Sequence, residues 1–90
     1  MSNRYTIDDV RARINTLHRV ATAAGLSVLN YHGSTTEGLY VIRSSGVLWL
    51  KGRAGDMGGA VDICRPGTAR ELCQYLQGLI DGIELQRFNA

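Results

Sequence analysis

The stretch "GLYVIRSSGVLWLK" (residues 38–51) decides the fold, because it holds two runs of strand-forming residues on either side of a turn. The runs Gly38–Arg43 and Val47–Lys51 are rich in branched and aromatic residues, which favour strands. Between them, "SSG" has the length of a three-residue hairpin loop, and Gly46 can adopt the positive φ of a bulge. The stretch therefore predicts an antiparallel hairpin.

Further strands are predicted on both sides of this hairpin. Leu26–Tyr31 has strand-like alternation and is joined to the hairpin by the polar loop "HGSTTEG". Ala60–Cys64 alternates apolar and polar residues and can form a short fourth strand. We therefore expect an antiparallel meander of three or four strands.

A first helix is predicted from the spacing of apolar residues near the N-terminus. Thr6 precedes these residues and Asp9 follows three positions later, a variant of the capping box that begins helices. Gly25 supplies a left-handed residue at the end. The apolar stripe, with steps of three and four, consists of Ile7, Val10, Ile14, Leu17, Ala21 and Ala24.

A second helix is predicted after the chain break at "RPG". Thr68 and Glu71 form a full capping box, and Gly82 is expected to end the helix. Gly78 lies inside it, which costs about 1 kcal/mol relative to alanine unless close packing requires a glycine. The remaining tail, with Phe88, is expected to dock on the domain. The apolar stripe consists of Leu72, Leu76, Leu79 and Ile83.

The predicted fold class is α+β, a single two-layer domain over residues 1–90, with both helices on one face of an antiparallel sheet. The strands carry apolar residues on both alternations, such as Tyr40 and Ile42 beside Leu39 and Val41. One helical layer cannot cover two apolar faces. The second face is therefore a candidate interface for a target or for self-association, unless the tail covers it.

Composition excludes several classes of protein. The longest apolar runs, such as Val47–Leu50, are far shorter than the roughly 20 residues of a membrane span. The N-terminus lacks the apolar stretch of a signal peptide, and two cysteines fit free thiols in the cytosol. The net charge of +2 does not by itself indicate nucleic-acid binding.

The glycine-rich stretch "KGRAGDMGGAVD" (residues 51–62) does not match a phosphate-binding loop. A P-loop needs Lys-Ser/Thr after the last glycine and then a helix, whereas here a predicted strand follows. The dinucleotide fingerprint fails on its glycine spacing. We expect a connection between strands, or a contact loop whose tip holds Lys51, Arg53, Asp56 and Met57.

Catalytic and metal-binding patterns are sparse. His18 lies at the flank of the first helix stripe, and His32 begins an ordinary polar turn. Together with Cys64 and Cys73 they have no recognised metal-ligand spacing. The prediction is a protein that is not an enzyme and has no metal or other cofactor.

Several short motifs resemble those of small bacteriophage and prophage proteins of unknown function, over most of the chain. The chain departs from that pattern in its glycine-rich stretch and in Trp49. The resemblance implies a phage setting in the cytoplasm of a bacterial host cell, and it carries no functional residues to transfer. The matching pieces are Ala23–Leu26, Tyr40–Arg43 and Thr68–Leu72, with Leu76 and Gly78.

The predicted function is binding to a host protein, for example one of a defence system, through the open sheet face and the loop tips. The alternatives are nucleic-acid binding by a basic sheet edge, with Arg43, Lys51, Arg53 and Arg65, and a small-ligand or nucleotide site in an oligomer. A homodimer through the sheet face is compatible with each of them. The predicted binding residues are Tyr31, Tyr40, Trp49, Lys51, Arg53 and Met57.

Overall fold

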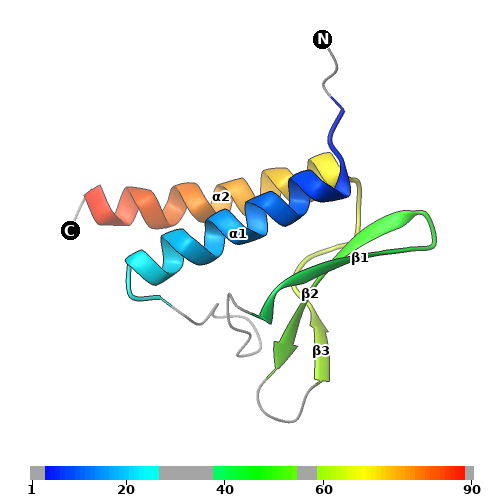
Figure 1. Ribbon diagram of the computed structural model, residues 1–90, viewed down its shortest axis with the longest axis horizontal. Coiled ribbons are helices and arrows are strands. Elements are labelled where there is room, and N and C mark those ends of the chain that lie inside the picture. Colours follow the sequence, from blue (N-terminus) through cyan, green and yellow to red (C-terminus); the bar gives the residue numbers. More distant parts are fainter. Residues whose placement is uncertain (1–3, 27–37, 55–58, 89–90) are drawn as a thin grey trace.

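The computed structural model describes residues 4–26, 38–54 and 59–88 of the chain (Figure 1). The predicted α+β order of helix, antiparallel strands and helix is confirmed. The elements are α1 (Ile7–Ala23), β1 (Tyr40–Ser44), β2 (Val47–Ala54), β3 (Gly59–Asp62) and α2 (Ala69–Phe88).

The start and end of α1 follow the predicted signals. The Thr6 N–H donates to Asp9 Oδ2 at 2.7 Å, and the Asp9 N–H donates to Thr6 Oγ1 at 3.4 Å. These bonds satisfy backbone groups that a helix start leaves without partners. At the other end, Gly25 has a φ of +76°, and the Leu26 N–H donates to the Ala21 carbonyl at 2.7 Å.

The start of α2 is also confirmed, but its predicted end at Gly82 is wrong. The Thr68 N–H donates to Glu71 Oε1 at 3.1 Å, and the Glu71 N–H donates to Thr68 Oγ1 at 3.2 Å. The helix continues through Phe88. One glycine costs a helix only about 1 kcal/mol, and continuation lets Ile83 pack against the core. The expected docking tail is therefore part of a helix.

The turn between β1 and β2 is shorter than expected. Ser44 pairs with Val47, so the loop holds two residues rather than three. Ser45 has a φ of 55° and Gly46 a φ of 80°, as a type I′ turn requires. The twist of this turn matches that of the strands, which explains why it replaces the longer loop.

The glycine-rich stretch is largely strand. β2 runs through Ala54, which pairs with Gly59, and residues 55–58 between them lie outside the described part of the chain. Lys51 and Arg53 therefore lie on a strand, so the alternative that placed these two residues at a loop tip is wrong. The expected strand Leu26–Tyr31 lies outside the described residues except for Leu26, which is not in a strand.

The two helices lie side by side and run in the same direction, and the sheet lies next to their first halves (Figure 1). The sheet has the order β1-β2-β3. Its inner face and the helices share one core, and the whole chain is flat, with extents of 40 × 39 × 17 Å. The buried core consists of Val10, Ile14, Leu17, Leu39, Val41, Leu48, Leu50, Ile63, Leu72, Cys73, Leu76 and Ile80.

Candidate functional site: the outer face of the sheet

Strand register assigns each side chain to one of two faces. Residues directly opposite in an antiparallel pair point to the same side, and neighbours along a strand point to opposite sides. One face carries buried residues such as Val41 and its partner Leu50. The other face, called here the outer sheet face, carries Tyr40, Ile42, Trp49, Lys51, Arg53 and Asp62.

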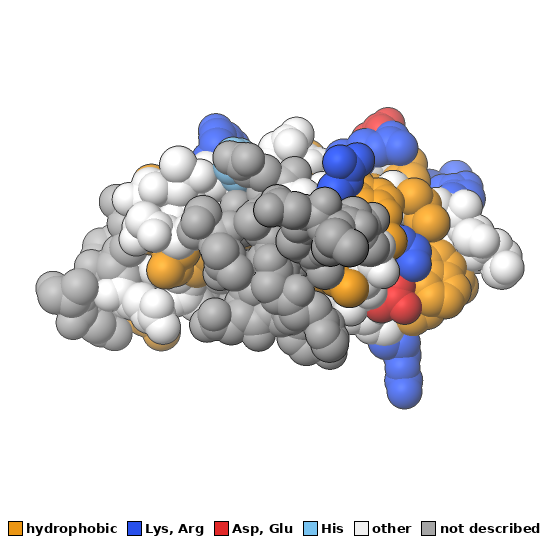
Figure 2. Space-filling view, turned by 90° about the horizontal axis from the view of Figure 1, so that it is seen from below, with side chains coloured by type: hydrophobic (Ala, Val, Ile, Leu, Met, Phe, Trp, Pro, Cys, Tyr) orange, Lys and Arg blue, Asp and Glu red, His pale blue; other side chains and the backbone are white. Residues whose placement is uncertain are grey.

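The outer sheet face is accessible over an apolar centre. Ile42 is 39% exposed, although it is a large apolar residue in the middle of a strand. Tyr40 and Trp49 are half-buried, whereas Leu50 on the inner face is 1% exposed. At the end of the molecule that holds the sheet, hydrophobic side chains adjoin basic and acidic ones (Figure 2). The helices thus cover one sheet face and leave apolar surface on the other.

Trp49 lies at the centre of this surface, and two interactions hold its side chain in place. Its cross-strand partner is Ile42. Its indole N–H donates to the Ser44 carbonyl at 3.3 Å. The Lys51 ammonium lies 5.2 Å from the ring centroid, within the range of a cation–π interaction. The polar atom of the indole is satisfied, so the ring can act as a fixed apolar anchor.

One of the cations on the outer sheet face is paired with a carboxylate. Lys51 Nζ lies 2.8 Å from Asp62 Oδ1, and the two side chains are 22% and 52% exposed. A pair this accessible contributes at most about 1 kcal/mol to stability, so its main effect is to position Lys51 beside the indole. Arg53 is exposed, and within the described part of the chain it makes no ion pair.

Four of the predicted binding residues, Tyr40, Trp49, Lys51 and Arg53, lie together on the outer sheet face. The other two, Tyr31 and Met57, lie outside the described residues. The sequence interpretation missed Ile42 and Asp62. Both share the alternation of predicted residues, but only the pairing register shows that Ile42 faces Trp49 and Asp62 faces Lys51.

The cations of the proposed basic edge do not share one surface. Arg43 pairs with Leu48 and so belongs to the alternation of the inner face, opposite to Lys51 and Arg53. Arg65 lies beyond the end of β3. A phosphate backbone needs its contacts along one side of a protein, so this distribution weakens the nucleic-acid alternative.

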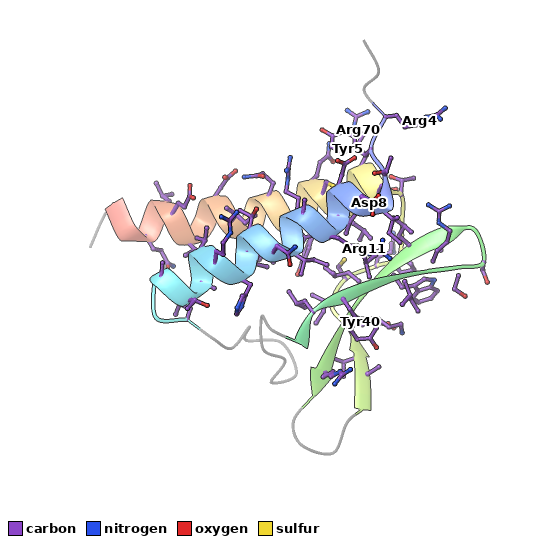
Figure 3. The ribbon with its side chains drawn as sticks, viewed as in Figure 1. Arg4, Tyr5, Asp8, Arg11, Tyr40 and Arg70 are labelled. Atoms are coloured by element: carbon purple, nitrogen blue, oxygen red, sulfur yellow. The ribbon has the colours of Figure 1, made fainter. Side chains whose placement is uncertain are left out.

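The starts of the two helices form a second group of polar side chains. Arg4, Tyr5 and Arg70 gather there, away from Tyr40 on the sheet (Figure 3). Both starts are closed by their own capping boxes, so the helix N–H groups used there are not available to an anion. Hydrogen bonds from the Thr68 backbone N–H and hydroxyl hold the pKa of Glu71 below its usual value.

The thiols show no sign of activation. Burial raises the pKa of Cys64, with a smaller contribution from the Asp62 carboxylate, and burial raises the pKa of Cys73. Both are free cysteines that stay protonated at neutral pH, and a protonated thiol is a poor nucleophile and metal ligand. In residues 4–26, 38–54 and 59–88, no three His, Cys, Asp or Glu side chains are grouped as metal ligands.

Comparisons with known protein families, curated proteins and solved structures found no match to this chain. The resemblance to phage proteins therefore stays a prediction. Among the described residues, neither helix is long and apolar enough to cross a membrane. The functional assignment accordingly rests on the geometry of the outer sheet face.

Proposed function

We propose that this chain is a non-enzymatic binding protein whose outer sheet face contacts another protein. One observation carries the proposal: both helices pack on the inner face, and the opposite face keeps an accessible apolar centre around Ile42 and Trp49. Contiguous apolar surface of this kind is commonly a site of protein interaction.

The composition of the surface fits a protein partner better than a nucleic acid. Tyr40 and Trp49 are aromatic, and tyrosine, tryptophan and arginine are the residues that most often anchor protein interfaces. The charged side chains of Arg53 and Asp62 lie around the apolar centre, as in an interface with an apolar core and a polar rim. The resemblance to phage proteins predicts that the partner is a protein of the bacterial host.

The experiment measures how much of a specific protein the tagged chain captures from a bacterial lysate that has been treated with nuclease. Two variants remove side chains from the outer sheet face, Tyr40→Ala and Arg53→Ala. Each has a matched control on the helical side, Tyr5→Ala and Arg19→Ala, at exposed positions away from the sheet. We expect the outer-face variants to lower capture of a specific protein about tenfold, a loss of roughly 1.4 kcal/mol, and the controls to retain it.

Two outcomes contradict the proposal. If folded Tyr40→Ala and Arg53→Ala capture the same protein as fully as their controls do, the outer sheet face is not the binding surface. If capture yields only nucleic acid, disappears with nuclease and weakens steeply with salt, phosphate contacts dominate and the basic-edge alternative is favoured.

A further inference from the structure

The hydrogen bonds of β2 show which way its backbone groups point. Leu48 and Gly67 exchange two backbone hydrogen bonds, at 2.8 and 3.0 Å, and the Leu50 carbonyl accepts from the Ile63 N–H at 3.0 Å. The backbone groups of Leu48 and Leu50 therefore point away from β1. In an antiparallel pair, two opposite residues either bond to each other or both point their backbone groups outward. The β1 partners of Leu48 and Leu50 must point theirs outward as well.

These partners are Arg43 and Val41. Their backbone N–H and carbonyl groups point to the side of β1 opposite to β2, called here the β1 edge. β1 is the outermost strand of the described sheet. Within residues 4–26, 38–54 and 59–88, no hydrogen bond joins these four groups to another residue. The β1 edge thus carries two donor and acceptor pairs, about 7 Å apart, which is the spacing that a neighbouring strand requires.

Two further features of β1 suit the addition of a strand. It pairs with β2 without a bulge and contains no proline or lysine, which are devices that commonly protect an edge strand. Ile42, between the two outward-pointing residues, is 39% exposed on the outer sheet face. A residue opposite Ile42 on an added strand would lie about 5 Å away and cover it.

We infer that the partner adds an extended segment of its own chain to the β1 edge as a further antiparallel strand. This inference rests on the proposed function and names its mode of recognition, in which backbone hydrogen bonds hold the segment and alternate side chains select it. Residues opposite Ile42 and Tyr40 lie on the outer sheet face and are apolar. The residue opposite the exposed Arg43 is acidic, because opposite charges attract across strands. The segment therefore reads acidic, apolar, any residue, apolar.

The first test is amide hydrogen exchange in the free wild-type chain at low concentration, followed by NMR. The Ile42 and Tyr40 N–H groups point to β2 and serve as internal controls. We expect the Val41 and Arg43 amides to exchange at least about tenfold faster than these controls. Equal protection in the free chain overturns the inference, because the chain then covers its own β1 edge. Protection that appears only as the concentration rises also overturns it, because a second copy then fills the edge.

The second test selects short random peptides that bind the wild-type chain and measures their affinity for two variants. Arg43→Pro removes the outward N–H without removing a bond to β2, and an edge strand tolerates proline at such a position. Arg43→Ala is the matched control, because it removes the same side chain and keeps the N–H. We expect Arg43→Pro to weaken binding at least about tenfold and Arg43→Ala about threefold. The selected peptides should carry the pattern acidic, apolar, any residue, apolar.

Circular dichroism shows whether each variant is folded. If Arg43→Pro is not, amide exchange of the wild-type chain with a selected peptide decides, and unchanged exchange at Val41 and Arg43 overturns the inference. It is also overturned if no peptide is selected, or if peptides bind Arg43→Pro as tightly as Arg43→Ala. The proposed function fails separately. If Tyr40→Ala and Arg53→Ala lower capture from the lysate but Arg43→Pro does not, the outer sheet face binds a protein without an added strand.

Discussion

At the scale of single residues, the hairpin turn has one position where the side chain does not suit the backbone. Ser45 has a φ of 55°, in the left-handed region that asparagine and glycine occupy most readily. Gly46, with a φ of 80°, already has the favoured residue for its place in a type I′ turn. The free-energy cost of the positive φ at Ser45 is therefore local, and a residue that adopts this φ more readily can remove it.

We predict that Ser45→Asn raises the free energy of unfolding by roughly 0.5 kcal/mol, and that Gly46→Ala lowers it by about 1 kcal/mol. Urea denaturation followed by circular dichroism measures both changes. Equal stability of the two variants would mean that the turn does not have two positive φ angles.

Glu71 predicts part of the pH dependence of stability. Its pKa is lowered in the folded chain by the hydrogen bonds from Thr68, so the folded state favours the ionised carboxylate. The stabilisation is complete above the usual glutamate pKa of about 4.3, and it is lost as the pH falls through the lower folded value. We predict that Glu71→Gln, which keeps a cap but cannot titrate, reduces the loss of stability below about pH 4.3.

Thermal unfolding of wild type and Glu71→Gln across acidic pH measures this difference. Parallel stability curves for the two proteins would show that the Thr68–Glu71 cap is not formed in its charged state.

At the scale of helices and strands, local signals predicted where elements begin better than where they end. The capping boxes at Thr6 and Thr68 use side chains within three residues, so the sequence shows them directly. The continuation of α2 past Gly82 depends on contacts with the core, which no local pattern contains. The same holds for the outer sheet face, where Ile42 and Asp62 become visible only with the strand register.

The two sides of α2 should respond differently to truncation. Leu76 is fully buried, whereas Leu85 is 62% exposed. We predict that Leu76→Ala lowers the free energy of unfolding by roughly 2–5 kcal/mol, because it removes apolar contacts and leaves a cavity. Leu85→Ala should change it by about 0.5 kcal/mol or less, because this side chain lies mostly in solvent.

Chemical denaturation of both variants provides the comparison. A similar cost at the two positions would contradict the assignment of the core side of the helix.

At the scale of the whole molecule, one layer of helices covers one face of a three-stranded sheet. The sequence predicted that the helices would leave one sheet face uncovered, because its strands carry apolar residues on both alternations and it has only two helices. It predicted Tyr40, Trp49, Lys51 and Arg53 as parts of one surface made of the sheet face and the loop tips, and the strand register places all four on the outer sheet face itself. The structure thus leaves the outer sheet face accessible.

The most direct test of the central claim uses Trp49, which is the only tryptophan in the chain and lies at the centre of the outer sheet face. The measurement is acrylamide quenching of its fluorescence in the free chain and in the complex with the protein that the chain captures. We predict that quenching falls severalfold in the complex, because the partner covers the half-buried indole. Unchanged quenching in a fully formed complex would contradict the outer sheet face as the binding surface.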